Sequence, residues 1–238
     1  RRLTASSVYT TAATGTSALA GPNTNTGTTI INVRTLLVND GCGAGTGKSV
    51  ANISKGGSMV GSTCMVSGSV NVNSGAAVLG GNGATASGTL TVADNLLLNA
   101  GSIIQLALGG GGTHTHSTLN RAAGNWTLAP NQGFTFISFG AQPGVYQGII
   151  TGLAADPGGE ASWTITNAGW SGTFTYDGAG DIDLNITSVH PALRLMSAVS
   201  RKTHGGAGTF DVPLPLSGQP GVECRSTGGA HTLVFTFS

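Results

Sequence analysis

The feature that most constrains this chain is a short pattern that recurs about every 20 residues. Residues 52–61 align with residues 71–80 at an offset of 19, and a third copy, residues 97–105, follows at a further offset of 26. Residues 67–72 also align with residues 87–92 at an offset of 20. Glycines punctuate the copies where a corner of the chain would need a positive φ. Self-similarity of this period is typical of a β-solenoid, in which each turn of chain stacks on the previous one.

In such a stack, residues at equivalent places in successive turns lie about 4.8 Å apart. The pattern predicts two interior ladders of apolar side chains, with Asn, Ser and Thr facing solvent between them. The predicted ladders are Val50, Val70 and Leu90, and Met59, Val78 and Ile104. A single turn buries too little apolar surface to offset the entropy of ordering it, so neighbouring turns must supply the rest. The alternative is a flat β-meander in which the repeat is coincidental.

Composition supports an all-β chain with many turns. Glycine accounts for 40 of the 238 residues and charged residues for only 8%, whereas helices in soluble proteins depend on Glu, Lys, Arg, Ala and Leu. A hydrophobic content of 39% with a net charge of +1 is wrong for a disordered chain. The balanced charge also argues against nucleic-acid binding, and no apolar run approaches the roughly 20 residues of a membrane span.

The sequence predicts four regions. Residues 1–40 form an N-terminal arm with the first strands, and residues 41–112 form the β-solenoid-like repeat region. In residues 113–188 apolar and polar residues alternate more strictly, which predicts an antiparallel β section that caps the stack. Residues 189–238, which follow His190-Pro191, predict a partial β-sandwich-like module. Its four expected strands, in residues 193–200, 209–216, 222–225 and 232–237, are too few for a complete sandwich, so the module is either incomplete or completed by a strand of another subunit. Residues 4–14 are a candidate donor strand.

Several motifs could carry chemistry, and each has a structural alternative. Residues 43–49 (GAGTGKS) resemble a phosphate-binding loop, but Cys42 stands where that loop needs its first glycine, and the following residues predict a strand. His114 and His116 could hold a metal together, although a solvated loop after four glycines is the simpler interpretation. Residues 177–183 (DGAGDID) form either a sparse calcium loop or a hairpin turn, and their spacing favours the turn. The carboxylates concerned are those of Asp177, Asp181 and Asp183.

The sequence offers no convincing active site. Glycan-cleaving β-helices need convergent carboxylates, but Asp94 is the only acid and Lys55 the only base between residues 50 and 108. Trp163 and Trp170 could line a binding site, yet core packing is the usual role of such residues. The prediction is therefore a non-enzyme with no catalytic, cofactor-binding or metal-binding residues.

The three cysteines, Cys42, Cys64 and Cys224, make neither a metal cluster nor a redox pair. Cys42 and Cys64 are about one turn of the repeat apart. A disulfide between them is an open alternative in an extracellular protein, and Cys224 would then be unpaired.

The stretch SGTLTVADNLLLNAGSIIQLALGG, preceded by VNSGAAVLGGNGA, resembles the autotransporter-associated β-strand repeats of bacterial surface proteins. Residues 124–187, from GNWTLAPNQGFTFISFG to GTFTYDGAGDIDLNIT, are similar to the region that closes such repeat arrays. Residues 201–238, from RKTHGGAGTFDVPLPLSGQPGVECRS to HTLVFTFS, look like a module of large secreted bacterial proteins. The resemblance implies an exported, β-rich surface or matrix protein, and that family provides no catalytic residue to carry over. The sequence departs from the autotransporter pattern in that its last residues predict no C-terminal membrane barrel.

Three functions are therefore expected, in decreasing order of support. The first is an extracellular structural protein of a bacterial surface that self-associates through strand edges or strand exchange into a filament, sheath or matrix. The second is an adhesin stalk or carbohydrate-binding module of a larger secreted protein, in contact with a glycan or a cell surface. The third is a degenerate β-helix enzyme that acts on glycans.

Overall fold

The protein is all-β, and its chain divides into two compact units, residues 1–190 and residues 191–238. The computed structural model describes residues 9–11, 15–19, 26–33, 35–38, 50–61, 65–81, 83–189, 195–218 and 232–237. Over these residues the only helical segments are two 3-10 turns, Glu160–Ser162 and Gly205–Ala207. None of the described helices has the length and apolar character needed to span a membrane.

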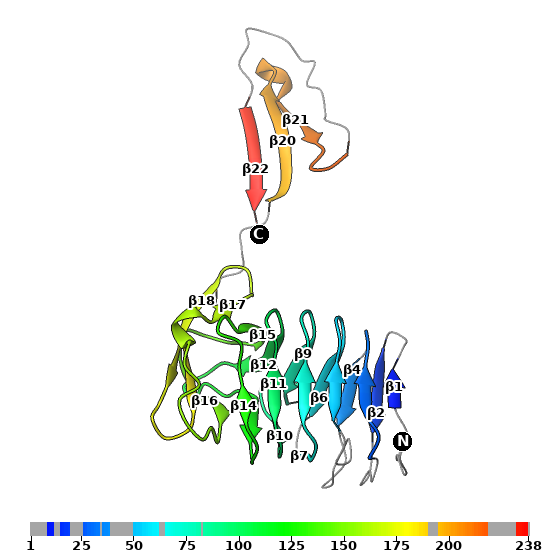
Figure 1. The fold of residues 1–238 in the computed structure, drawn as a ribbon. Helices are drawn as coiled ribbons and strands as arrows, with labels where there is room; N and C mark the ends of the chain where they lie inside the picture. The colour runs from blue at the N-terminus through cyan, green and yellow to red at the C-terminus, as the bar shows by residue number, and fades with distance from the viewer. Residues whose placement is uncertain are drawn as a thin grey trace. The chain divides into compact units, whose positions relative to one another are not determined.

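Three sheets form the first unit, and each contains strands from successive turns of the chain (Figure 1). Sheet A consists, in spatial order, of β1 (Tyr9–Thr11), β3 (Thr29–Ile31), β5 (Ala51–Ile53), β8 (Val70–Val72), β11 (Leu96–Leu98) and β14 (Trp126–Thr127). Sheet B consists of β2 (Thr16–Leu19), β4 (Thr35–Val38), β6 (Ser58–Gly61), β9 (Ala77–Gly80), β12 (Ile103–Gly109), β15 (Gly133–Phe139) and β17 (Thr164–Ile165). Sheet C consists of β7 (Met65–Val66), β10 (Thr89–Val92), β13 (Thr118–Arg121), β16 (Gly144–Thr151), β19 (Ile182–Val189) and β18 (Trp170–Tyr176).

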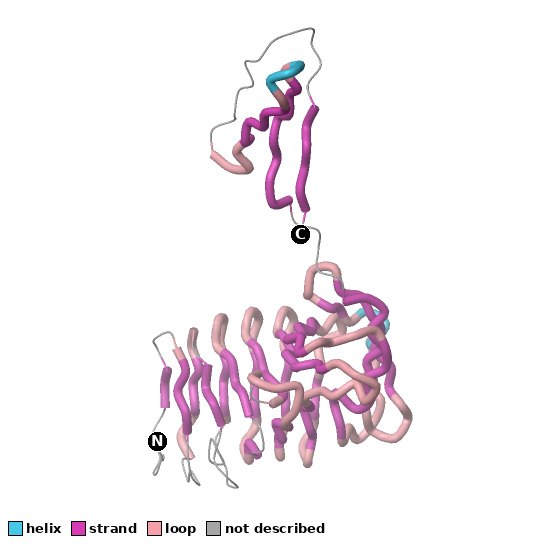
Figure 2. Tube along the Cα trace, turned by 180° about the vertical axis from the view of Figure 1, so that it is seen from behind, coloured by secondary structure: helices cyan, strands magenta, loops and turns pink. Residues whose placement is uncertain are grey.

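From β5 to β16 the chain visits sheets A, B and C in turn. Apart from β7, which is the edge strand of sheet C, each strand from β5 to β17 pairs in parallel with the strand one turn earlier. Figure 2 shows these strands in successive rows, joined by loops at both ends. The connectivity is compatible with the predicted β-solenoid. It excludes the β-meander alternative, since neighbours in a meander run antiparallel.

The predicted ladder of Met59, Val78 and Ile104 is confirmed. Met59 pairs with Val78 and Val78 with Ile104, all in sheet B, and the three side chains are fully buried. The pairing of Asn52 with Asn71 reproduces the offset of 19, and that of Asn71 with Leu97 the offset of 26.

The predicted ladder of Val50, Val70 and Leu90 is wrong. Val70 lies in sheet A, where it pairs with Ala51 and Leu96, whereas Leu90 lies in sheet C and pairs with Leu119. Val50 is 38% exposed and precedes the strand. A glycine followed by alternating apolar residues starts a strand in either sheet, so the alignment at an offset of 20 matched strands of two different sheets.

The antiparallel section begins later in the chain than predicted. Strands β13, β14, β15 and β17 continue the parallel stack, and within the first unit antiparallel pairing of the described strands is confined to β16, β18 and β19. Alternation of apolar and polar residues reports that one face of a strand is buried, but it does not report the direction of the neighbouring strand. The prediction of an antiparallel section over residues 113–188 is therefore wrong for β13, β14, β15 and β17.

Aromatic side chains close the core where β18 and β19 end sheet C. Phe134 is fully buried, and its ring centroid lies 4.3 Å from that of Phe174 and 5.4 Å from that of Trp163. Trp170 stacks on Phe136 with an interplanar angle of 15°. Trp163 is 7% exposed, so the prediction that the tryptophans pack in the core is confirmed for this residue.

The second unit contains one three-stranded antiparallel sheet, in the order β21 (Thr209–Leu214), β20 (Leu195–Thr203) and β22 (Thr232–Phe237). Three of the four expected strands are therefore found among the described residues. The fourth, at residues 222–225, lies outside them, as do His190, Pro191 and most of the candidate donor strand.

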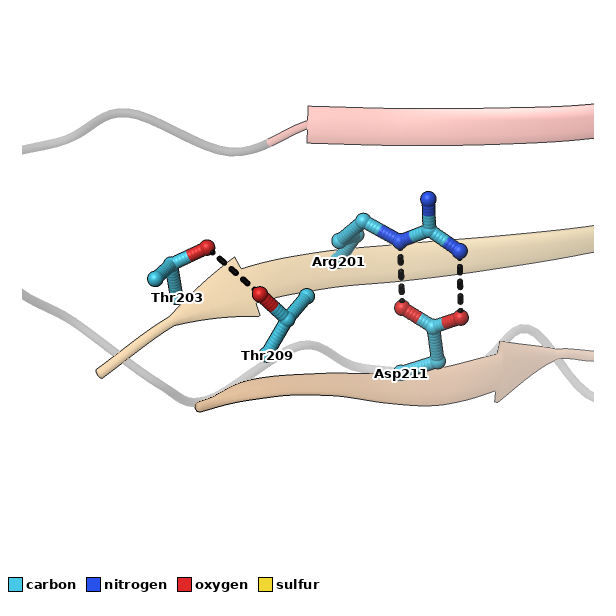
Figure 3. A network of polar contacts seen from close by, with 4 residues as sticks. All are labelled: Arg201, Thr203, Thr209 and Asp211. Carbon is cyan, nitrogen blue, oxygen red and sulfur yellow. Dashed lines mark hydrogen bonds and ion pairs between the residues drawn. The ribbon is translucent and has the colours of Figure 1, made fainter. Parts of the chain in front are cut away.

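The sheet of the second unit has two unlike faces. On one face Arg201 forms a two-pronged ion pair with Asp211 at 2.8 Å, next to a hydrogen bond between the hydroxyls of Thr203 and Thr209 (Figure 3). The strand register places the large apolar side chains on the other face. They include Phe210, Leu233, Phe235 and Phe237, each at least 50% exposed. This second set is called the apolar face below.

Candidate functional site

Two rows of outward-facing side chains run across sheet A. The inward row, Ala51, Val70, Leu96 and Trp126, is fixed by the parallel register of β5, β8, β11 and β14. Because alternate residues of a strand point to opposite faces, the residues on either side of this row point outward. The first outward row is Val50, Ser69, Asn95 and Asn125, and the second is Asn52, Asn71, Leu97 and Thr127. None of the eight side chains carries a charge.

A shallow trough of about 470 Å³ lies along these rows, and seven of their eight residues line it. Hydrogen bonds between turns hold several of the side chains in place. The Asn71 side-chain amide donates to Asn52 Oδ1 at 2.9 Å, and the Asn95 amide donates to Ser69 Oγ at 3.4 Å. Ser69 Oγ in turn donates to Asp94 Oδ2 at 3.1 Å. The floor of the trough is thus ordered by the fold itself.

The predicted outward position of the polar residues is confirmed for Asn52 and Asn71. Lys55 follows β5 and Asp94 precedes β11, so the two lie at opposite ends of the sheet A strands. The arrangement therefore does not bring this acid and this base together.

A second cavity, of about 460 Å³, lies where sheet C meets its antiparallel strands. Its lining includes the candidate aspartates and one candidate histidine: His116, Thr118, Gln147, Gly148, Thr151, Asp177, Asp181 and Asp183. The carboxylates accept hydrogen bonds from backbone amides. Asp183 accepts from Gly148 at 2.8 Å and Asp181 from Gly152 at 3.2 Å. Over the residues the structure describes, His, Cys, Asp and Glu form no group of three that could hold a metal ion.

Asp177 belongs to a hairpin turn, as the preferred interpretation of the DGAGDID segment predicted. Tyr176 pairs with Ile182, and Asp177 Oδ1 accepts hydrogen bonds from the amides of Ala179, Gly180 and Asp181 at 2.7–3.1 Å. The hydrogen bond from the Asp181 amide is the first of the causes that lower the pKa of Asp177, followed by that from Ala179. These bonds favour the ionised carboxylate, so the turn is built around a charge.

We predict that the Asp177→Asn variant has a lower free energy of unfolding than the wild type at neutral pH, and that this difference becomes smaller in acid. A lowered pKa in the folded state stabilises the fold above the ordinary pKa of aspartate, about 3.9, and this contribution disappears as the pH falls through the lower folded value. The difference in unfolding free energy between wild type and variant should be constant above about pH 5 and shrink below about pH 4. Denaturant unfolding across that range measures it.

The control is Asp156→Asn. Among the described residues, the Asp156 carboxylate accepts one hydrogen bond, from the Gly158 amide. The control should show a smaller loss at neutral pH. A difference between wild type and the Asp177→Asn variant that does not change between pH 6 and pH 3 would contradict the charged turn.

The rings of His114 and His116 both pack against the ring of Tyr146, and their Nε2 atoms face different partners. Their ring centroids lie 4.9 and 6.4 Å from that of Tyr146. His114 Nε2 is 3.1 Å from the carbonyl oxygen of Pro143, and His116 Nε2 is 2.7 Å from that of Gln147. Each Nε2 is therefore engaged by a separate carbonyl. Burial raises the pKa of Tyr146, whose hydroxyl donates to the Gly109 and Gln142 carbonyls.

Sequence reasoning missed Arg121, which braces a corner of the stack. Its Nε and Nη2 donate to the Gly124 carbonyl at 2.9 and 2.6 Å, and its Nη1 donates to the Gly152 carbonyl at 2.9 Å. A cavity of about 380 Å³ lies beside it and is also lined by Trp126 and Asp156. Charge-assisted bonds to two successive corners make this arginine a structural brace. No motif surrounds it, so the sequence carried no signal for this role.

Other sequence candidates lie outside the described residues. These are the glycine-rich segment 43–49 and the cysteines Cys42, Cys64 and Cys224. That residues 43–49 are not a phosphate-binding loop therefore stays a prediction, and a disulfide between Cys42 and Cys64 stays an open alternative.

Comparison with known proteins finds no match to this chain, whether among protein-family models, among curated proteins or among solved structures.

Proposed function

We propose that this chain is a structural segment of a bacterial surface, a stiff spacer whose copies associate into a filament, sheath or matrix. The observation that carries the proposal is the unbroken parallel register of sheets A and B, which stacks turn on turn over a continuous apolar interior. Each turn adds hydrogen bonds on both sides, so stiffness follows from repetition. The outward rows of sheet A are uncharged, and copies can approach them without electrostatic repulsion.

Two features support association between copies. The strands β1 and β2 form the outer edges of sheets A and B among the described residues, and an unpaired strand edge is a template for another strand. The second unit has an apolar face, and two such faces packed together would form the layers of a sandwich. The extracellular location is proposed on the Thr-, Ser-, Gly- and Asn-rich composition and the family resemblance of the repeat.

The test is the state of association of the purified chain, measured by light scattering and negative-stain electron microscopy at rising concentration. We expect assemblies that grow with concentration. Monomers alone at about 1 mM would overturn the proposal.

The adjacent substitutions Phe235→Asp and Thr236→Asp show which surface is used, because they add the same charge to opposite faces of β22. Phe235→Asp should weaken association about tenfold or more, and Thr236→Asp should leave it nearly unchanged. Equal effects of the two would show that association does not use the apolar face.

A further inference from the structure

We propose that the trough on sheet A binds a single chain of a neutral, extended polysaccharide, laid across the strands. This goes beyond the spacer function and does not depend on it. Three properties of the trough carry the inference: the geometry of its two rows, the absence of charge, and the mixture of amide, hydroxyl and small apolar groups that line it.

The geometry favours a long, narrow ligand. The lining residues come from, or immediately precede, four adjacent strands of sheet A, so the trough extends over about 14 Å at the usual strand spacing. The two rows are two residues apart along each strand, which separates them by about 7 Å. A sugar ring fits between rows at that separation. An extended β-linked chain also places one ring near every strand, because its rise per sugar is close to the strand spacing.

The chemistry of the trough favours hydroxyl groups. An asparagine side chain both donates and accepts, as a sugar hydroxyl does. The Asn125 side-chain amide and the Thr127 hydroxyl have no hydrogen-bond partner within the described part of the chain, and both residues are exposed. They are therefore available to a ligand at no cost to the fold.

Apolar contacts are present between the polar groups. Leu97 is 39% exposed and Val50 is 38% exposed, and they stand in opposite rows of the trough. The C–H faces of a sugar ring can pack on such side chains while its hydroxyls reach the neighbouring amides. The nearest charged residue in the sequence, Asp94, immediately precedes Asn95 of the first row and accepts a hydrogen bond from Ser69, and its carboxylate would repel a polyanion. The ligand class is therefore neutral.

The two cavities described above, beside His116 and beside Trp126, carry no comparable argument. The carboxylates of the cavity beside His116 are engaged by backbone amides, and the guanidinium beside Trp126 is engaged by two carbonyls. These charged groups stabilise the fold through their backbone hydrogen bonds, so they are not available to bind a ligand.

Calorimetric titration with neutral hexasaccharides tests the proposal, with cellohexaose, xylohexaose and mannohexaose as probes and hexagalacturonate as the anionic comparison. We expect at least one neutral probe to bind with a dissociation constant of about 1 mM or below and the anionic probe to bind at least about tenfold more weakly. If no neutral probe binds at about 10 mM, the proposal is overturned.

Two variants locate the binding site. Leu97→Lys and Asn125→Ala change exposed trough residues and should each weaken binding about tenfold. Val145→Lys is the matched control, since Val145 is an exposed apolar residue of sheet C, 47% exposed. It should bind as the wild type does. If Val145→Lys weakens binding as much as Leu97→Lys, the site is not the trough. Association of copies is measured separately, so the spacer proposal and this one fail independently.

Discussion

Replacing Phe134 with alanine is expected to lower the free energy of unfolding of the first unit by about 3–5 kcal/mol. The side chain is fully buried and its ring contacts the rings of Phe174 and Trp163, so its removal leaves a cavity where the antiparallel strands close the core. All three tryptophans, Trp126, Trp163 and Trp170, belong to the first unit. Tryptophan fluorescence in a denaturant titration therefore measures the unfolding of that unit alone.

The matched control is Phe139→Ala in the same strand, because Phe139 is 41% exposed. This change should cost less than about 1 kcal/mol. Similar losses for the two variants would show that the aromatic cluster does not hold the closed end of the stack together.

Replacing Gly124 with alanine is expected to cost about 3 kcal/mol or more, from two causes. Gly124 has a φ of +77°, which side chains other than glycine rarely adopt. A Cβ there would also collide with the backbone of Asp94 in the preceding turn. The second cause is steric, and it cannot be relieved unless two turns of the stack move apart.

Gly111→Ala separates the two causes. Gly111 has a comparable φ of +89°, but no atom lies within 4 Å of the position that its Cβ would occupy. This control should cost only about 1 kcal/mol, the backbone term. If the two variants lose equal stability in the same fluorescence-monitored titration, close approach between turns does not limit residue 124.

The outcome of the sequence predictions follows from what each pattern encodes. The ladder through Met59, Val78 and Ile104 was predictable because its segments repeat within one sheet. The ladder through Val70 and Leu90 failed because strands of two sheets begin with the same short pattern. The turn with an offset of 26 is longer because of its connection through β10. A repeat of constant length does not predict this longer turn.

The trough was only partly predictable. The repeat indicated that Asn52 and Asn71 face outward, since polar residues alternate with apolar ones in both copies. It did not indicate that Leu97 and Thr127 continue the same row, because that depends on the register of β11 and β14. The structural role of Arg121 could not be predicted, because its hydrogen-bond partners are backbone carbonyls, which have no sequence signature.

The parallel stacking has a mechanical consequence. Hydrogen bonds between turns run from one strand to the next, along the direction in which the turns stack. Tension along that direction would therefore separate one turn at a time from its neighbour. The β1–β2 side would yield first, because the antiparallel hairpin and its aromatic rings secure the opposite side. The turn of 19 residues from Asn52 to Asn71 would release roughly 65 Å of chain, and the longer turns would release more. If the proposed surface function holds, the chain would lengthen in steps under shear and limit the peak force on its attachment.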